Sequence, residues 1–167
     1  IMKTAYSNVN QHITPCFLFL VNNYGKAAAA VHFYTKIFPA SSITGIKLYQ
    51  EEEGERLAGK VKHSQFILDD LVFMAMDGFG PHEFAFNEGL SLVVECKDQA
   101  TIDYYWHKLI EGGGEESMCG WLKDPFGISW QIIPANIDRL IMDPEKGQRA
   151  MQALLKMRKI DIAAMEN

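Results

Sequence analysis

The chain has 167 residues, 48% of them hydrophobic and 22% charged, which is enough for one domain or for two small modules that share a core. Its net charge of −5 gives no general attraction to nucleic acid or to an anionic membrane, so neither is an expected partner. No apolar run approaches the roughly 20 residues of a transmembrane helix, and the first residues lack the apolar core of a signal peptide. Cys16, Cys96 and Cys119 have no metal-type spacing, which predicts a reduced, cytoplasmic protein.

The first half of the chain predicts a strand, a helix and three more strands. Residues 1–11 are polar, and we expect a flexible N-terminus there. An apolar, aromatic run predicts a buried strand, and four consecutive alanines favour the helix that follows. The expected elements are a strand at 13–21, a helix at 26–38, and strands at 42–49, 60–68 and 71–76.

The second half repeats this order. Asp98 is a good N-cap for a helix whose apolar side chains share one face. The expected elements are a strand at 90–96, a helix at 99–110, an edge strand at 115–118, and strands at 120–123 and 128–133. The order of the expected elements repeats, although the amino-acid sequence itself does not, and this order predicts two modules of similar fold.

The stretch from Cys119 to Pro134 predicts a hairpin. Asp124-Pro125-Phe126-Gly127 has the composition of a type I turn. The strand after it should be central in a sheet and should end at Pro134, which has no amide hydrogen to donate. Gln131 is a polar residue in this otherwise apolar strand, and a buried polar group needs a partner.

Residues after Pro134 predict two C-terminal helices, a short one at 135–142 and a long one at 143–165. We expect the modules at 12–80 and 81–135 and the C-terminal helices at 136–167 to form one compact α+β domain. The long helix has an apolar face and a basic remainder, which indicates packing on its own sheet or on a second subunit.

His63 and Gln65 share one face of the third expected strand. If that face is concave, they place a titratable ring and an amide where a ligand could be oriented, and His63 is the best catalytic candidate. The alternative is a structural histidine bonded to a neighbouring carbonyl. Trp121 could stack on a planar ligand, whereas Trp130 should be core. Asp77 is a candidate general base only if it is buried.

Ser91 and Gln131 are expected to face one another across the site. They are neutral groups that could bind a ligand oxygen. Alternatively, they bond each other or an ordered water to satisfy buried polarity.

Six motifs in order resemble one family, the PhnB-like branch of the vicinal oxygen chelate superfamily, which includes glyoxalases, bleomycin resistance proteins and dioxygenases. The family often carries the label 3-demethylubiquinone-9 3-methyltransferase. The motifs cover about residues 13–134: I-T-P-C-F-L-F from Ile13, H-F-Y-T-K-I-F from His32, G-K-V-K-H-S-Q-F-I-L from Gly59, F-M-A-M-D from Phe73, F-N-E-G-L-S-L-V-V-E-C from Phe86, and G-W-L-K-D-P-F-G-I-S-W-Q-I-I-P from Gly120.

The resemblance implies two βαβββ modules whose glyoxalase-like curved mixed sheet forms a cup, completed within one chain or in a homodimer. In metal-dependent relatives, inward His and Glu side chains hold a divalent cation there. At the matching positions this chain has Phe17, Met74, Ser91 and Gln131. None is a good ligand for a hard cation, so we expect no cofactor and no metal site.

Three functions remain open. The first is a PhnB-like small-molecule-binding protein or enzyme with an apolar cup lined by Phe17, His63, Gln65, Met74, Ser91, Trp121 and Gln131. The second is a metal-dependent glyoxalase or dioxygenase that holds its divalent metal with other ligands. The third is a non-catalytic binding or resistance protein. The family label itself is not supported by the sequence, since Asn22-Asn23-Tyr24-Gly25 is not the glycine-rich strand-to-helix turn of a doubly wound cofactor fold.

Overall fold

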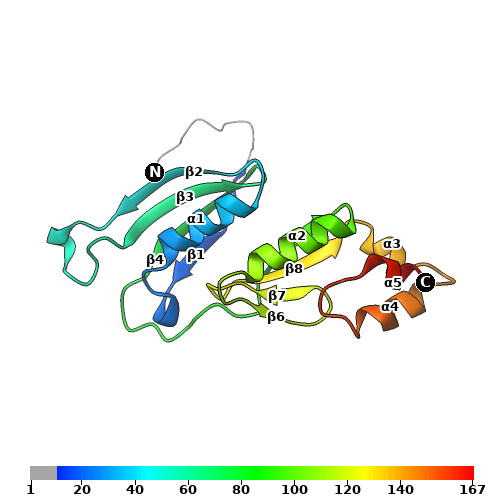
Figure 1. Cartoon of the computed structure of the whole chain (residues 1–167). Coiled ribbons are helices and arrows are strands. Elements are labelled where there is room, and N and C mark those ends of the chain that lie inside the picture. Colours follow the sequence, from blue (N-terminus) through cyan, green and yellow to red (C-terminus); the bar gives the residue numbers. More distant parts are fainter. Residues whose placement is uncertain (1–10) are drawn as a thin grey trace. The chain divides into compact units, whose positions relative to one another are not determined.

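The computed structural model describes residues 11–167, which form two compact units, one ending at Ala85 and the other beginning at Phe86 (Figure 1). Within these residues eight strands form two four-stranded mixed sheets, with the orders β1-β4-β3-β2 and β5-β8-β7-β6. The fold is therefore α+β with two βαβββ modules, as predicted. The first unit contains β1 (Cys16–Phe19), η1 (Val21–Asn23), α1 (Ala27–Ile37), β2 (Ser42–Leu48), η2 (Glu51–Glu53), β3 (Val61–Leu68) and β4 (Leu71–Asp77). The second contains β5 (Ser91–Cys96), α2 (Gln99–Ile110), β6 (Glu115–Glu116), β7 (Trp121–Lys123), β8 (Ser129–Pro134), α3 (Ile137–Ile141), α4 (Gly147–Leu154) and α5 (Ile162–Glu166).

The N-terminal tail expected at residues 1–11 lies outside the described residues except for Gln11. Gln11 is held in place: its Nε2 donates to the carbonyl oxygen of Val72 at 2.9 Å, and its Oε1 accepts from the Val72 amide at 3.0 Å. The side chain thus mimics a strand partner beside β4.

Aromatic packing joins α1 to the first sheet. Tyr34 of α1 is fully buried, and its ring meets that of Phe17 edge to face, with the centroids 6.3 Å apart. Phe66 and Phe73 stack beneath, on the same face of the sheet, with centroids 5.7 Å apart. Figure 1 shows α1 lying across this face. Within residues 11–85, α1 is the α-helix of this unit, and it leaves the opposite face of the sheet open.

Asp77, at the end of β4, is 2% exposed and links three segments of the first unit. Its Oδ1 accepts from the amides of Gly25 and Ala27 at 2.8 and 3.2 Å, and its Oδ2 accepts from the amide of Val61 at 2.8 Å. Two of these donors lie at the N-terminus of α1, where backbone N–H groups lack helical partners. Asp77 is therefore buried, but its carboxylate is occupied by hydrogen bonds that fix the start of α1 and of β3, which is a structural role.

In the second unit, α2 has the bounds that the sequence predicts. Asp98 caps it by accepting from the Thr101 amide at 2.8 Å. Trp106 is 1% exposed, and its Nε1 donates to Glu116 Oε1 at 2.8 Å, which ties α2 to β6.

The hairpin between β7 and β8 is built around Asp124, which is 3% exposed. The amide of Gly127 donates to the carbonyl oxygen of Asp124 at 3.0 Å, which closes the predicted turn. The carboxylate accepts from the amides of Phe126 and Ile128 at 2.8 and 3.1 Å and from Trp130 Nε1 at 2.8 Å. β8 lies between β5 and β7 with Trp130 buried, so both the central strand and the core role of Trp130 are confirmed.

The prediction of a single long helix at 143–165 is wrong. α4 ends at Leu154 and α5 begins at Ile162. The chain between them bonds to the β7 region: the carbonyl oxygens of Met157 and Arg158 accept from the amides of Cys119 and Gly120 at 2.8 and 2.7 Å. Ile160 is fully buried in a small C-terminal core, and this burial outweighs the helical preference of the sequence.

Across residues 11–167 no helix has both the length and the apolar character needed to cross a bilayer. The three cysteines are unpaired, and Cys96 is the buried one.

Candidate functional site

The open face of the first sheet brings together three of the predicted site residues. On β4, Met74 pairs with Gln65 of β3 on one side and with Cys16 of β1 on the other. His63 lies two residues before Gln65 and therefore on the same face, next to Met76. His63, Gln65 and Met74 are half-buried. The result is a titratable ring and an amide beside two thioethers.

Phe17 lies on the opposite face, and its expected place on the ligand-facing side is corrected. It is 4% exposed, and its ring contacts Tyr34 of α1 as well as Phe66 and Phe73. Side chains alternate along a strand, so the open face of β1 belongs to its neighbours Cys16 and Leu18.

The second sheet brings together the other three predicted residues. On β8, Gln131 pairs with Trp121 of β7 on one side and with Val93 of β5 on the other. Gln131 Nε2 donates to Ser91 Oγ at 2.9 Å. Ser91 and Gln131 thus belong to adjacent strands of one sheet and bond each other, which corrects the expectation that they face one another across the site.

The two units place their candidate residues on equivalent strands. Each sheet has the same strand order, with one parallel and one antiparallel neighbour beside its central candidate strand, β4 or β8. Met74 and Gln131 lie on these central strands, and Gln65 and Trp121 lie on the antiparallel neighbours.

A small pocket of about 150 Å³ lies in the second unit and is lined in part by Trp121, the strand neighbour of Gln131. Trp121, Lys123 and Ser129 line it from β7 and β8. Ser129 is 2% exposed, and its Oγ has no hydrogen-bond partner among the described residues. A buried hydroxyl without a partner costs free energy, and a ligand or a water that enters the pocket could recover it.

Glu88 closes the same pocket by an ion pair, since its carboxylate lies 2.6 Å from Lys123 Nζ. The hydrogen bond from Lys123 lowers the pKa of Glu88. An exposed carboxylate with a lowered pKa is a poor general base at neutral pH. Glu88 therefore contributes charge to the mouth of the pocket.

A divalent cation does not fit the residues at the positions where the resemblance implies metal ligands. The candidate atoms are the Met74 thioether, the Ser91 hydroxyl and the Gln131 amide, all neutral, while Phe17 offers none. Ser91 and Gln131 are also committed to each other. Hard cations prefer anionic oxygen ligands. In the part of the chain that the structure describes, no three His, Cys, Asp or Glu side chains are grouped so that they could hold a metal ion.

A larger pocket, of about 700 Å³, was not foreseen from the sequence and contains none of the predicted residues. Its lining comes from the connection after β1, the β2–β3 loop and residues 78–82. The spacing of apolar residues identifies helices and strands, and residues 78–82 show neither helical nor strand-like spacing. The available signal was Gly78-Phe79-Gly80-Pro81-His82, in which an aromatic ring and an imidazole stand in a loop.

The family model described as 3-demethylubiquinone-9 3-methyltransferase matches residues 11–133. The solved structure of the PhnB protein from Bacillus cereus is 36% identical, with a TM-score of 0.66 over 74% of this chain and 99% of that chain. Protein PA1353 from Pseudomonas aeruginosa is 18% identical, with a TM-score of 0.62 over 75% of this chain and 98% of that one. The fosfomycin resistance protein FosX from Listeria monocytogenes is 10% identical, with a TM-score of 0.50 over 78% and 96% of the two chains. These last two share the fold only. No curated protein matches the chain.

Proposed function

Since the chain belongs to the PhnB-like family of glyoxalase-fold proteins, whose family model bears the name 3-demethylubiquinone-9 3-methyltransferase, we propose that the open face of each unit's sheet is a surface that binds a small organic molecule without a metal ion. The observation that carries this proposal is the neutral Ser91–Gln131 pair beside Trp121 and the unpartnered Ser129 hydroxyl.

The second unit offers a ligand both stacking and hydrogen bonds. Trp121 is half-buried and provides an indole face. Within the described residues, Gln131 uses one N–H for Ser91, which leaves its second N–H and its carbonyl oxygen available. The ligand that fits has a flat apolar body and at least one hydrogen-bonding oxygen or nitrogen.

In the first unit, proton transfer to or from a ligand would fall to His63, because its imidazole lies on the open face of that sheet beside Gln65. An imidazole can exchange a proton near neutral pH. Gln65 and Met74 would orient the ligand beside it. If His63 moves no proton, the protein is a binding or resistance protein with the same site.

Methyl transfer is left out of this proposal. The β1-to-α1 connection contains a 3₁₀ turn at Val21–Asn23, and its one glycine, Gly25, lies just before α1. A doubly wound cofactor fold would place a glycine-rich turn there. Calorimetric titration with S-adenosylmethionine tests this point, and we expect no heat of binding.

We place the protein in the cytoplasm as a homodimer. Three cysteines without a disulfide fit a reducing compartment. Leu90 and Val93, 70% and 52% exposed, provide apolar surface at the edge strand β5 that a second copy could cover. Light scattering of the eluted protein should give about twice the 18.9 kDa chain mass, and a monomer at all concentrations would contradict the dimer.

Metal loading tests the metal-free character of the site. The chain is incubated with Mn²⁺, Ni²⁺ or Zn²⁺, desalted, and analysed for bound metal. We expect far less than one equivalent, whereas near-stoichiometric metal would contradict the proposal. The double variant Ser91→His, Gln131→Glu serves as the positive control, because it places an imidazole and a carboxylate on adjacent strands and should retain more metal.

A further inference from the structure

A pocket of about 700 Å³ lies where three strands of the first sheet end. β1, β2 and β4 run in the same direction, because β1 is parallel to β4 while β2 and β4 are both antiparallel to β3. The connections that follow these strands therefore all begin at the same end of the sheet. Leu20 to Tyr24, Arg56, and residues 78–82 come from these three connections and enclose about 700 Å³, a usual size for a small-molecule site.

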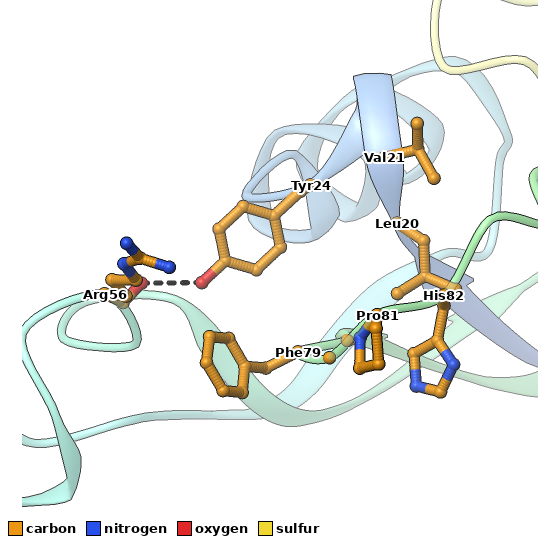
Figure 2. A pocket seen from close by; sticks show the side chains of 9 residues that line it. Leu20, Val21, Tyr24, Arg56, Phe79, Pro81 and His82 are labelled. Atoms are coloured by element: carbon orange, nitrogen blue, oxygen red, sulfur yellow. Dashed lines mark hydrogen bonds between the residues drawn. The ribbon is translucent and has the colours of Figure 1, made fainter.

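The lining combines apolar surface with a small number of polar groups. In Figure 2 the rings of Tyr24 and Phe79 lie on two sides of the pocket, with Leu20 and Pro81 at one end and Arg56 at the other. Tyr24 Oη donates to the main-chain carbonyl oxygen of Arg56 at 2.6 Å, which fixes the β2–β3 loop against the pocket. Burial raises the pKa of Tyr24, so its phenol stays protonated and keeps this bond.

Two residues that line the pocket have energetically unfavourable features that the packing of the fold does not explain. Val21 has a φ of +50°, and a β-branched residue is rarely found in the left-handed region. Phe79 is 56% exposed, although aromatic rings are usually covered. Backbone strain and exposed aromatic surface gather at ligand-binding sites, and here both belong to one pocket.

Arg56 lines the pocket and none of the described acidic residues does, while Glu51, Glu52 and Glu55 belong to the same loop outside the lining. The guanidinium of Arg56 has no ion-pair partner within residues 11–167. Lys60 Nζ lies 5.6 Å from the centroid of the Tyr24 ring and adds a second cation nearby. Asp77, next to Gly78, already accepts three backbone N–H groups. In the neighbouring η2 turn, Glu53 is paired with Lys62 and does not line the pocket.

We propose that this pocket is a second ligand site, which takes an anion with a flat apolar body, such as an aryl carboxylate. The carboxylate meets the guanidinium of Arg56, which can pair with it through two N–H groups. The body lies between Tyr24 and Phe79, in contact with Leu20. This site shares no residue with the metal-free site on the open sheet faces and adds to it.

Titration of the ¹⁵N-labelled full chain with benzoate tests the proposal, with benzyl alcohol as the neutral probe of similar shape. We expect benzoate to shift the amide resonances of Tyr24, Gly78 and Gly80 with a Kd on the order of 1 mM. Benzyl alcohol should bind there at least about fivefold more weakly.

Two variants identify the residue responsible. Arg56 is exposed and has no ion-pair partner in the described part of the chain, so Arg56→Gln should fold normally. This variant should weaken benzoate binding about fivefold or more and leave benzyl alcohol binding unchanged, whereas Arg56→Lys should retain part of the affinity. His63→Ala should leave benzoate binding as it is, which separates this site from the open faces. Absence of shifts at these three amides, equal affinity for the two probes, or equal benzoate affinity in Arg56→Gln would overturn the proposal.

Discussion

Gln131 Nε2 donates a hydrogen bond to Ser91 Oγ over 2.9 Å, between the parallel strands β8 and β5. Both groups are neutral and half-buried, and the family resemblance implies that both stand at metal-ligand positions of metal-dependent relatives. Each group meets part of its hydrogen-bonding capacity through the other. The hydrogen bond also orients the amide, so that its remaining donor and acceptor are fixed in direction.

A double-mutant cycle measures this pair. Ser91→Ala removes the acceptor and leaves the Gln131 amide half-buried without it, so the free energy of unfolding should fall by about 1 kcal/mol in urea titrations. Combining it with Gln131→Leu should give a coupling energy of about 0.5–1.5 kcal/mol. The control cycle combines Val93→Ala with Gln131→Leu, because Val93 neighbours Gln131 but its side chain has no hydrogen-bonding group, so no hydrogen bond couples the two side chains. Additive effects of Ser91→Ala and Gln131→Leu would show that the bond contributes nothing.

Asp77→Asn should destabilise the first unit strongly. The carboxylate accepts three backbone N–H groups, and an amide turns one acceptor oxygen into a donor that faces them. We expect a loss of about 3 kcal/mol in the free energy of unfolding, from urea denaturation followed by circular dichroism. Asp70→Asn is the matched control, because Asp70 is exposed with a φ of +64°, a conformation that asparagine tolerates equally. Similar losses in the two variants would contradict the role assigned to Asp77.

His63→Ala should leave stability almost unchanged and weaken ligand binding. No hydrogen bond to the imidazole is found in the described part of the chain, so its removal should change the free energy of unfolding by less than about 0.5 kcal/mol. If the protein is an enzyme, the same change should abolish turnover. His32→Ala, on the exposed surface of α1, is the control for loss of a histidine. A large fall in the melting temperature of His63→Ala alone would assign His63 a structural role.

Cys96 should resist alkylation in the folded protein. Burial, followed by the charge of Asp98, raises the pKa of its thiol from 9.0 to about 11. At pH 8 the thiolate fraction then falls about 100-fold, so iodoacetamide should modify Cys96 roughly 100-fold more slowly than in the urea-unfolded chain, as followed by peptide mass spectrometry. The folded state keeps its full stability from this group below pH 9 and loses it as the pH rises through 11. Equal rates in the folded and unfolded chains would contradict burial of the thiol.

Local signals in the sequence were sufficient for most of the elements. Asp98 marked the start of α2, and the turn residues from Asp124 to Gly127 located the hairpin before β8. Apolar periodicity identified the strands because each sheet has one face under a helix. The order of the elements then indicated two modules, and the register within each sheet brought His63, Gln65 and Met74 together.

Long-range packing decided the elements and sites that the sequence did not reveal. The interruption after Leu154 depends on Ile160 and on hydrogen bonds to Cys119 and Gly120, which are distant in the chain. Phe17 was assigned to the wrong face because both faces of β1 carry apolar residues. The alternation of polar and apolar residues that identifies the exposed face of a strand is missing there. The pocket lined by Arg56 is formed by three loops, and loops lack the regular spacing of apolar residues from which helices and strands are predicted.

The most direct test of the metal-free site is a fragment screen of the full chain in the presence of EDTA, read at the side-chain amides of Gln131 and Gln65, the indole of Trp121 and the methyl group of Met74. We predict that at least one flat, neutral fragment with a hydrogen-bonding oxygen saturably shifts the Gln131 and Trp121 signals of the second unit, or the Gln65 and Met74 signals of the first, with EDTA present. Adding Mg²⁺ or Zn²⁺ in place of EDTA should leave the affinity unchanged. Fragments that bind at these residues only when the metal is added, and are lost again on chelation, would contradict the account.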